Sequence, residues 1–134
     1  MKLDHSVLCV SDWERSNRFY ETVLGAEVVP LGQMFAYRFG DKQLNVHGPG
    51  LKVGPQQLAR IPVPPGGADL CFRWEGPIQG AVDHLKRCEV AIEHGPTLTF
   101  GARGFGVSVY FRDPDGSLLE LISYDEPTEP YKRG

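Results

Sequence analysis

Hydrophobic and polar positions follow the same order in the two halves of the chain. The first half predicts strands at residues 3–10, 27–30, 34–39 and 43–47. Between the first two strands, apolar residues at helical spacing predict a helix that begins after Ser11 and stops at Gly25. Ser11 with Glu14 three positions later has the pattern of a capping box.

The second half predicts a similar succession of elements. Its strands are expected at residues 68–74, 89–93, 97–100, 107–112 and 117–124. A helix opens at Gly76-Pro77, and its apolar residues follow the i, i+3, i+4, i+7 spacing of an amphipathic helix. Residues 101–106 read as a glycine-rich loop. Both halves are therefore interpreted as βαβββ modules, the second with one short strand more than the first.

The expected organisation is one domain, residues 1–124, made of two modules. Module one covers residues 2–47 and module two covers residues 68–124. The linker 48–67 is rich in glycine and proline, which cannot continue a sheet ladder. The polar tail 125–134 is expected to fray. Because neither half can bury its own sheet, the halves close on each other or on the halves of a second chain.

Composition narrows the class of protein. The 134 residues are 41% hydrophobic and 23% charged, with a formal net charge of −3, as in an ordinary soluble domain. No run of Lys or Arg could follow a phosphate backbone, so nucleic acid is not an expected partner. No apolar run approaches the length of a membrane span, and the start does not resemble a signal peptide. The odd number of cysteines, three, favours free thiols in the reducing cytoplasm.

Three side chains of metal-binding type lie at the same phase of separate predicted strands: His5, His47 and Glu120. A metal site needs imidazole and carboxylate groups to converge from rigid elements. Glu120 shares its strand face with Leu118 and Ile122, where a carboxylate either lines a cavity or violates the pattern. Taken alone, His5 reads as a partly buried histidine and His47 as a solvent-facing residue at a strand end.

Three segments together resemble the vicinal oxygen chelate superfamily. They are LDHSVLCVSDWERSNRFYETVLGAEVV, FGDKQLNVH and VYFRDPDGSLLELISY, and the likeness extends over about residues 2–124. The superfamily includes glyoxalase I, bleomycin-resistance proteins, fosfomycin-resistance enzymes and extradiol dioxygenases, and the arrangement is most similar to small glyoxalase-domain proteins. The resemblance implies an α+β fold in which paired βαβββ modules form a curved eight-stranded mixed sheet around a metal cavity. It also implies a homodimer.

The resemblance further implies metal ligands on the first and last strands of each module. These positions are His5 and His47 in module one and Asp69 and Glu120 in module two. Glyoxalase I usually has a carboxylate in place of His47 and a histidine in place of Asp69. The exchange keeps two imidazoles and two carboxylates, which favours a retained site. Asp69 is shorter than histidine, so it binds directly, binds through water, or only accepts hydrogen bonds from the nearby glycine bend.

Other polar residues are candidates for substrate contact. Arg73 is in phase with Asp69, and Arg103 lies in the glycine-rich loop, so both could meet an anionic substrate. Surface solvation is the ordinary alternative for both arginines. Tyr110 shares a polar strand face with Ser108 and Arg112, and this face lines the cavity or meets water.

These residues lead to one main hypothesis and two alternatives. The main one is a glyoxalase-type lyase or isomerase in which Zn, Ni, Co, Fe or Mn chelates adjacent oxygens of a small substrate. The resemblance implies that Glu120, the expected catalytic residue, or Asp69 exchanges between metal ligation and proton transfer. The first alternative is a bleomycin-resistance-type protein that sequesters a flat compound without chemistry. Its aromatic walls would be drawn from Trp13, Phe35, Tyr37, Phe72 and Trp74. The second is an Fe(II) ring-cleaving dioxygenase, which the absence of a histidine at position 69 disfavours.

Overall fold

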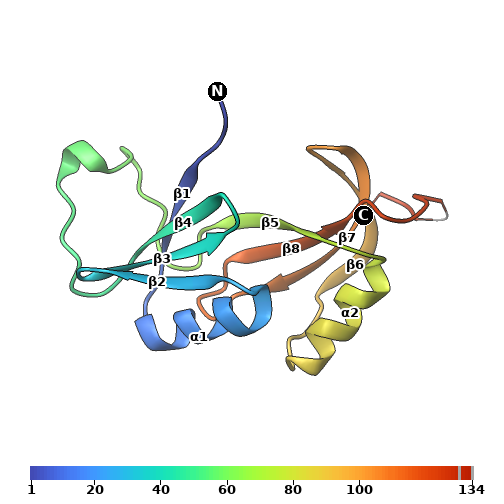
Figure 1. Ribbon diagram of the computed structural model, residues 1–134, viewed down its shortest axis with the longest axis horizontal. Coiled ribbons are helices and arrows are strands. Elements are labelled where there is room, and N and C mark those ends of the chain that lie inside the picture. The colour runs from blue at the N-terminus through green and yellow to red at the C-terminus, as the bar shows by residue number, and fades with distance from the viewer. Residues whose placement is uncertain (130, 134) are drawn as a thin grey trace. The chain divides into compact units, whose positions relative to one another are not determined.

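The first half of the chain forms a four-stranded mixed sheet with one helix (Figure 1). In the computed structural model, which describes residues 1–129 and 131–133, its elements are β1 (His5–Cys9), α1 (Trp13–Leu24), β2 (Glu27–Leu31), β3 (Met34–Phe39) and β4 (Lys42–His47). The order across the sheet is β1-β4-β3-β2. Strands β1 and β4 are parallel, and the other neighbours are antiparallel.

The second half repeats this topology. Its elements are β5 (Asp69–Trp74), α2 (Ile78–Arg87), β6 (His94–Gly101), β7 (Gly104–Arg112) and β8 (Leu118–Ser123). Their order is β5-β8-β7-β6, again with the first and last strands parallel. The prediction of paired βαβββ modules is confirmed, and the eight strands are distributed over two four-stranded sheets. A short 3-10 helix, η1 (Pro55–Gln57), lies in the linker.

The chain divides into two compact units, each with its own buried side chains. The first holds residues 1–68 and the turn 113–117, and the second holds residues 69–112 and the chain from 118 onward. In the first unit, the stacked rings of Tyr20 and Tyr37 are fully buried, with centroids 4.8 Å apart. In the second, Val109 and Phe111 of β7 are buried on the sheet face opposite Ser108 and Tyr110. None of the described helices is long and apolar enough to cross a membrane.

The first helix starts one residue later than the sequence predicts. Asp12 is the N-cap, and its carboxylate accepts a hydrogen bond from the backbone N–H of Arg15 at 2.9 Å. Glu14 forms an ion pair with Arg18 at 3.0 Å. The predicted capping box at Ser11 is therefore wrong, because Asp12 is an equally good cap and lies nearer the first turn. The predicted stop at Gly25 is confirmed, with a φ of 68° that favours glycine.

Two predictions in the second half are also wrong. Residues 89–93 are not a strand: α2 ends at Arg87, and Glu89 adopts a φ of 59° that turns the chain. The expected loop at 101–106 is a tight hairpin, because Gly101 of β6 pairs directly with Gly104 of β7. Gly104 has a φ of 102°, which glycine tolerates without strain. Gly101, Gly104 and Gly106 therefore belong to the two strands and are not part of a separate loop.

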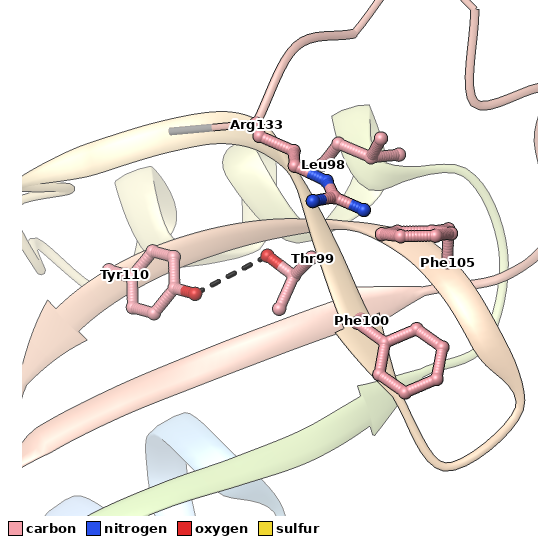
Figure 2. A pocket seen from close by; sticks show the side chains of 6 residues that line it. All are labelled: Leu98, Thr99, Phe100, Phe105, Tyr110 and Arg133. Atoms are coloured by element: carbon pink, nitrogen blue, oxygen red, sulfur yellow. Dashed lines mark hydrogen bonds between the residues drawn. The ribbon is translucent and has the colours of Figure 1, made fainter.

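Two residues of the tail, Lys132 and Arg133, are paired with β6, which the sequence analysis does not predict. The backbone N–H of Leu98 and the hydroxyl of Thr97 both donate to the carbonyl oxygen of Lys132, each at 2.7 Å. Arg133 forms a parallel bridge with Leu98, and its guanidinium lies 4.7 Å from the ring centroid of Phe105 (Figure 2). The edge of β6 thus receives part of its missing backbone pairing from the tail.

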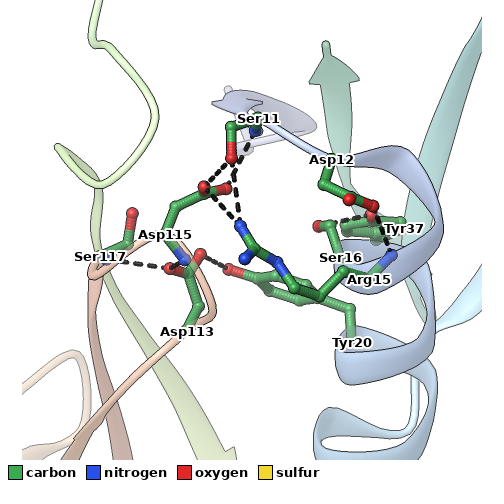
Figure 3. A network of polar contacts seen from close by, with 9 residues as sticks. All are labelled: Ser11, Asp12, Arg15, Ser16, Tyr20, Tyr37, Asp113, Asp115 and Ser117. Carbon is green, nitrogen blue, oxygen red and sulfur yellow. Dashed lines mark hydrogen bonds and ion pairs between the residues drawn. The ribbon is translucent and has the colours of Figure 1, made fainter. Parts of the chain in front are cut away.

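The turn at 113–117 is held in the first unit by a network of polar contacts (Figure 3). Asp113 is 5% exposed and accepts a hydrogen bond from the Tyr20 hydroxyl at 2.8 Å and from two backbone N–H groups of its own turn. Asp115 accepts hydrogen bonds from the hydroxyl and backbone N–H of Ser11 and pairs with Arg15 at 3.2 Å. Asp113 and Asp115 therefore connect the turn to α1 and to Ser11 before it, in addition to shaping the turn itself.

This network predicts that Tyr20→Phe destabilises the protein, because a buried carboxylate loses one donor. We expect a loss of about 1–3 kcal/mol in the free energy of unfolding, measured by urea denaturation at pH 7. Tyr124→Phe is the matched control, since its hydroxyl accepts a long hydrogen bond, 3.4 Å, from the backbone N–H of exposed Arg103. A loss no larger than that of the control would contradict the assignment.

Tyr20 also predicts alkaline sensitivity. Burial and the neighbouring Asp113 raise the pKa of Tyr20 above its ordinary value, and burial raises the pKa of Tyr37 to about 12. Above a pH of roughly 10 the unfolded tyrosines lose their protons while the folded ones keep them, so stability falls as the pH rises. Unfolding curves between pH 8 and 11.5 should show this fall in the wild type and a smaller fall in Tyr20→Phe.

Candidate functional site

Glu120 is a buried carboxylate in the middle of β8. The residue is 7% exposed, and the Ser108 hydroxyl donates a 2.5 Å hydrogen bond to its Oε2 atom. Tyr110 of β7 is paired with Glu120 in the register of the sheet. A buried carboxylate needs polar partners, and β7 supplies them from adjacent positions on the same face. The sequence analysis places Ser108 and Tyr110 on one polar strand face, but it does not predict that this face is paired with Glu120.

Two further acidic hydrogens face the same carboxylate. Cys71 of β5 is opposite Glu120 in the parallel pairing and belongs to the exposed residues of its strand. Partial desolvation of the thiol, followed by the charge of Glu120, raises its pKa to about 12. Burial, with a further contribution from Glu120, also raises the pKa of Tyr110, whose hydroxyl lies 3.3 Å from that of Thr99. Near neutral pH, Cys71 and Tyr110 are therefore protonated hydrogen-bond donors around one carboxylate.

The other predicted site residues of the second unit, Asp69, Arg73 and Arg103, do not lie opposite Glu120 in the sheet. Asp69 opens β5 opposite Leu118, two positions before Cys71, and is exposed. Arg73 is opposite Ile122 and forms an exposed ion pair with Glu75 at 3.3 Å. Arg103 is one of the two residues that connect β6 to β7. Its backbone N–H donates to the Tyr124 hydroxyl.

In the first unit, His5 and His47 lie at opposite ends of the β1–β4 pair. His5 is opposite Gln43, whereas His47 is opposite Cys9. The offset of four positions corresponds to about 13 Å along the strands at roughly 3.3 Å per residue. Both histidines nevertheless line one pocket of about 370 Å³, to which Asn45 also contributes. The exposed His5 ring has its Nδ1 atom 2.8 Å from the carboxylate of Asp4.

The registers of the two modules reveal a further candidate, Asn45. In the first sheet Asn45 is opposite Val7, and in the second Glu120 is opposite Cys71. Val7 and Cys71 each follow the first residue of their strand, His5 or Asp69, by two positions. Asn45 therefore takes the place in module one that Glu120 takes in module two. Alternation alone could not separate Asn45 from His47, because both lie on the same face of β4.

The linker closes over the same face of β1 and β4. Besides His5, Asn45 and His47, the 370 Å³ pocket is lined by Lys52 and Gln57 of the linker. A neighbouring pocket of about 220 Å³ shares His47 and Gln57 and reaches Pro62 and Val63. The polar face of the first sheet thus has two hollows shaped by residues 51–63.

The donor chemistry of these positions suits a divalent cation. Histidine nitrogen and carboxylate or amide oxygen are ligands of Zn, Ni, Co, Fe and Mn. Each described sheet offers only part of such a set: His5, Asn45 and His47 in the first, and Asp69 and Glu120 in the second. Among residues 1–129 and 131–133, no group of three or more His, Cys, Asp or Glu side chains is arranged to hold a metal ion.

The topology of the two modules indicates a class of protein, and comparison with known families identifies it. Residues 2–121 match the model of the Glyoxalase/Bleomycin resistance protein/Dioxygenase superfamily, so the chain belongs to this superfamily. This finding confirms the resemblance seen in the sequence.

Several relatives are similar over most of their length. Virulence protein STM3117 of Salmonella typhimurium is 40% identical over 92% of this chain and 84% of its own. The glyoxalase domain-containing protein RDO1 of Mycosarcoma maydis is 40% identical over 92% of this chain and 69% of its own. The structure of an integron cassette protein from V. cholerae is 39% identical, covers 93% of this chain and 96% of its own, and has a TM-score of 0.84.

The cluster around Glu120 predicts an effect on thiol reactivity. Glu120→Gln removes a negative charge beside Cys71, so the pKa of the thiol falls and its alkylation by iodoacetamide at pH 9 becomes several-fold faster. Mass spectrometry of the Cys71 peptide measures this rate, with Cys88 of the same molecules as the internal reference. Glu75→Gln, at an exposed site, should leave the rate unchanged. Equal rates in Glu120→Gln and wild type would show that the carboxylate does not influence the thiol.

Proposed function

We propose that the protein is a divalent-metal-dependent enzyme of the glyoxalase type, with lyase- or isomerase-like chemistry on a small substrate that presents two adjacent oxygens. The observation that carries the proposal is the burial of the Glu120 carboxylate in the middle of a strand, beside Ser108 and Tyr110 of β7. As part of the same proposal, the protein acts as a homodimer in the cytoplasm. The family resemblance favours the dimer, and the free cysteines favour a reducing compartment.

Keeping a carboxylate in this position has an energetic cost. A glutamate that is 7% exposed loses most of its hydration, and the Ser108 hydroxyl replaces only part of it. A hydrophobic residue would satisfy β8 better if packing were the only requirement, because the strand is otherwise mostly buried and apolar. A carboxylate retained at such a place is well suited to bind a cation or to carry a proton.

The proposed ligands are His5, His47, Asp69 and Glu120, with Asn45 as the alternative to His47. The register of β4 supports Asn45, whereas imidazole chemistry supports His47. When bound, the ion would act as a Lewis acid on the adjacent oxygens of the substrate. The amide of Asn45 also accepts a 2.7 Å hydrogen bond from Gln43, which fixes its orientation.

The protein's own groups would handle protons and charge. Ser108 holds Oε2 of Glu120, so the carboxylate has a defined direction in which to take or return a proton. Tyr110, which burial keeps protonated, can donate a hydrogen bond to a substrate oxygen on which negative charge develops. Arg73 and Arg103 remain proposed contacts for an anionic part of the substrate.

A second candidate function is the binding of a small molecule without chemistry. The hollows of about 370 and 220 Å³ on the first sheet favour it, since apolar linker residues such as Leu51, Leu58 and Val63 form parts of their walls. Calorimetry in the presence of a chelator separates the two functions, because only the binding protein would retain its ligand affinity without metal.

The enzyme proposal predicts metal stoichiometry. Protein purified without chelator should contain about one divalent ion per chain, and His5→Ala or Glu120→Gln should lower the content at least about tenfold, as expected for the loss of a ligand. Elemental analysis measures the content, and thermal unfolding confirms that each variant is folded. Unchanged metal content in both variants would reject the metal site.

A paired comparison distinguishes the two candidates on β4. If the register governs ligation, Asn45→Ala should lower the metal content more than His47→Ala. The reverse order would favour His47. His84→Ala is the matched control, because His84 lies on α2 beside Trp74 and outside the proposed set.

A further inference from the structure

We propose that the β6–β7 hairpin and the C-terminal segment form a binding site for a small planar aromatic anion, such as an aromatic carboxylate. The site is a pocket of about 600 Å³ in the second unit, lined by Leu98, Thr99, Phe100, Phe105, Tyr110 and Arg133 (Figure 2). The hollow is largely open to solvent, and its volume is sufficient for a flat ligand to lie against its walls. The proposal does not depend on a metal ion.

Two aromatic side chains make the pocket suitable for a flat ligand. Phe100 is 74% exposed and Phe105 is 40% exposed, and their rings meet edge to face with centroids 5.2 Å apart. Large apolar side chains at the tip of a hairpin gain little from folding, because they remain in contact with water. A planar ligand that stacks on them would remove this apolar surface and use the preferred geometry of aromatic pairs.

The charge of the pocket selects an anion. Of the six lining residues, Arg133 alone carries a charge at neutral pH, and its guanidinium lies 4.7 Å from the centroid of Phe105. A guanidinium offers two parallel N–H donors that match the two oxygens of a carboxylate. Because the Arg133 guanidinium lies over the Phe105 ring, an aromatic carboxylate can pair with the guanidinium and place its own ring against Phe105.

Hydroxyl groups complete the polar part of the site. The hydroxyls of Thr99 and Tyr110 lie 3.3 Å apart. Because the single hydrogen of Tyr110 faces Glu120, the Thr99 hydroxyl is the one that can turn to donate to a phenolic or carboxylate oxygen. Tyr110 also interacts with Glu120, so it is the one residue common to this pocket and the proposed catalytic residues. Apolar, cationic and donor groups therefore surround one space, as the recognition of an aromatic acid requires.

The position of Arg133 is set by backbone pairing. Lys132, its neighbour, accepts two hydrogen bonds from β6, one from Leu98 and one from the Thr97 side chain. These two hydrogen bonds to the Lys132 carbonyl oxygen fix the backbone of the segment that places the Arg133 guanidinium at the pocket. The ordering of the long arginine side chain is partly completed before a ligand arrives, which favours affinity.

Titration with three matched compounds tests the charge and shape requirements. The compounds are 2-naphthoate, its neutral isostere naphthalene-2-carboxamide, and the non-aromatic anion cyclohexanecarboxylate. Binding is measured on the full chain by calorimetry and by NMR chemical shifts, with and without a chelator. We expect 2-naphthoate to bind at least about tenfold more tightly than either other compound, since each lacks one charged or stacking contact. Retention of this order in chelator is expected even if the metal proposal fails.

Variants then assign the contacts. Arg133→Gln should weaken 2-naphthoate about tenfold or more and leave the carboxamide nearly unchanged. Phe105→Leu should weaken both aromatic compounds. Arg87→Gln is the matched control for charge, because Arg87 is an exposed residue at the end of α2. Thermal unfolding of each variant separates lost binding from lost folding.

Three outcomes overturn the proposal. The first is equal affinity for the three compounds, which would indicate non-specific partition into an apolar surface. The second is an equal loss of 2-naphthoate binding in Arg133→Gln and Arg87→Gln, which would indicate a general charge effect. The third is no binding together with a change of oligomeric state in Phe100→Ser, which would assign the aromatic pair to contact with a second copy.

Discussion

The parallel pairing of the first and last strands in each module is the constraint on which the other features depend. Two parallel strands need a long crossover, which α1 begins in one module and α2 in the other. This pairing brings strands from the two ends of a module side by side. As a result, residues as distant in sequence as Val7 and Asn45, or Cys71 and Glu120, lie opposite one another.

The sequence pattern predicted the modules well because alternation and helical spacing are local properties. The register of parallel strands is not local, so alternation along β4 does not distinguish His47 from Asn45, which is the counterpart of Glu120 in the first module. The strand assigned to residues 89–93 was wrong because a non-glycine residue, Glu89, adopts a positive φ that no simple pattern signals. The pairing of the tail with β6 was missed because its residues are polar and its partner, the carbonyl of Lys132, belongs to the backbone.

Burial has different consequences for the two acidic clusters. Asp113 receives a tyrosine hydroxyl and two backbone N–H groups, so its hydrogen bonds are made within the first unit and its role is structural. Glu120 receives a 2.5 Å bond from Ser108 and has Cys71 and Tyr110 as neighbours that keep their protons. Glu120 lies among hydrogen-bond donors at a site with little hydration, so it can still bind a cation or exchange a proton. Asp113 cannot do so as readily, because its hydrogen bonds already hold the turn.

Tyr110 connects the proposed chemistry with the proposed aromatic site. Its ring lines the pocket beside Thr99, while its hydroxyl is influenced by Glu120. The single hydrogen of this hydroxyl can be donated to one acceptor at a time. An anion in the aromatic site that accepted it would therefore withdraw it from Glu120. Physical coupling through one shared side chain requires no movement of the sheet, because both contacts already lie on adjacent strands of the second unit.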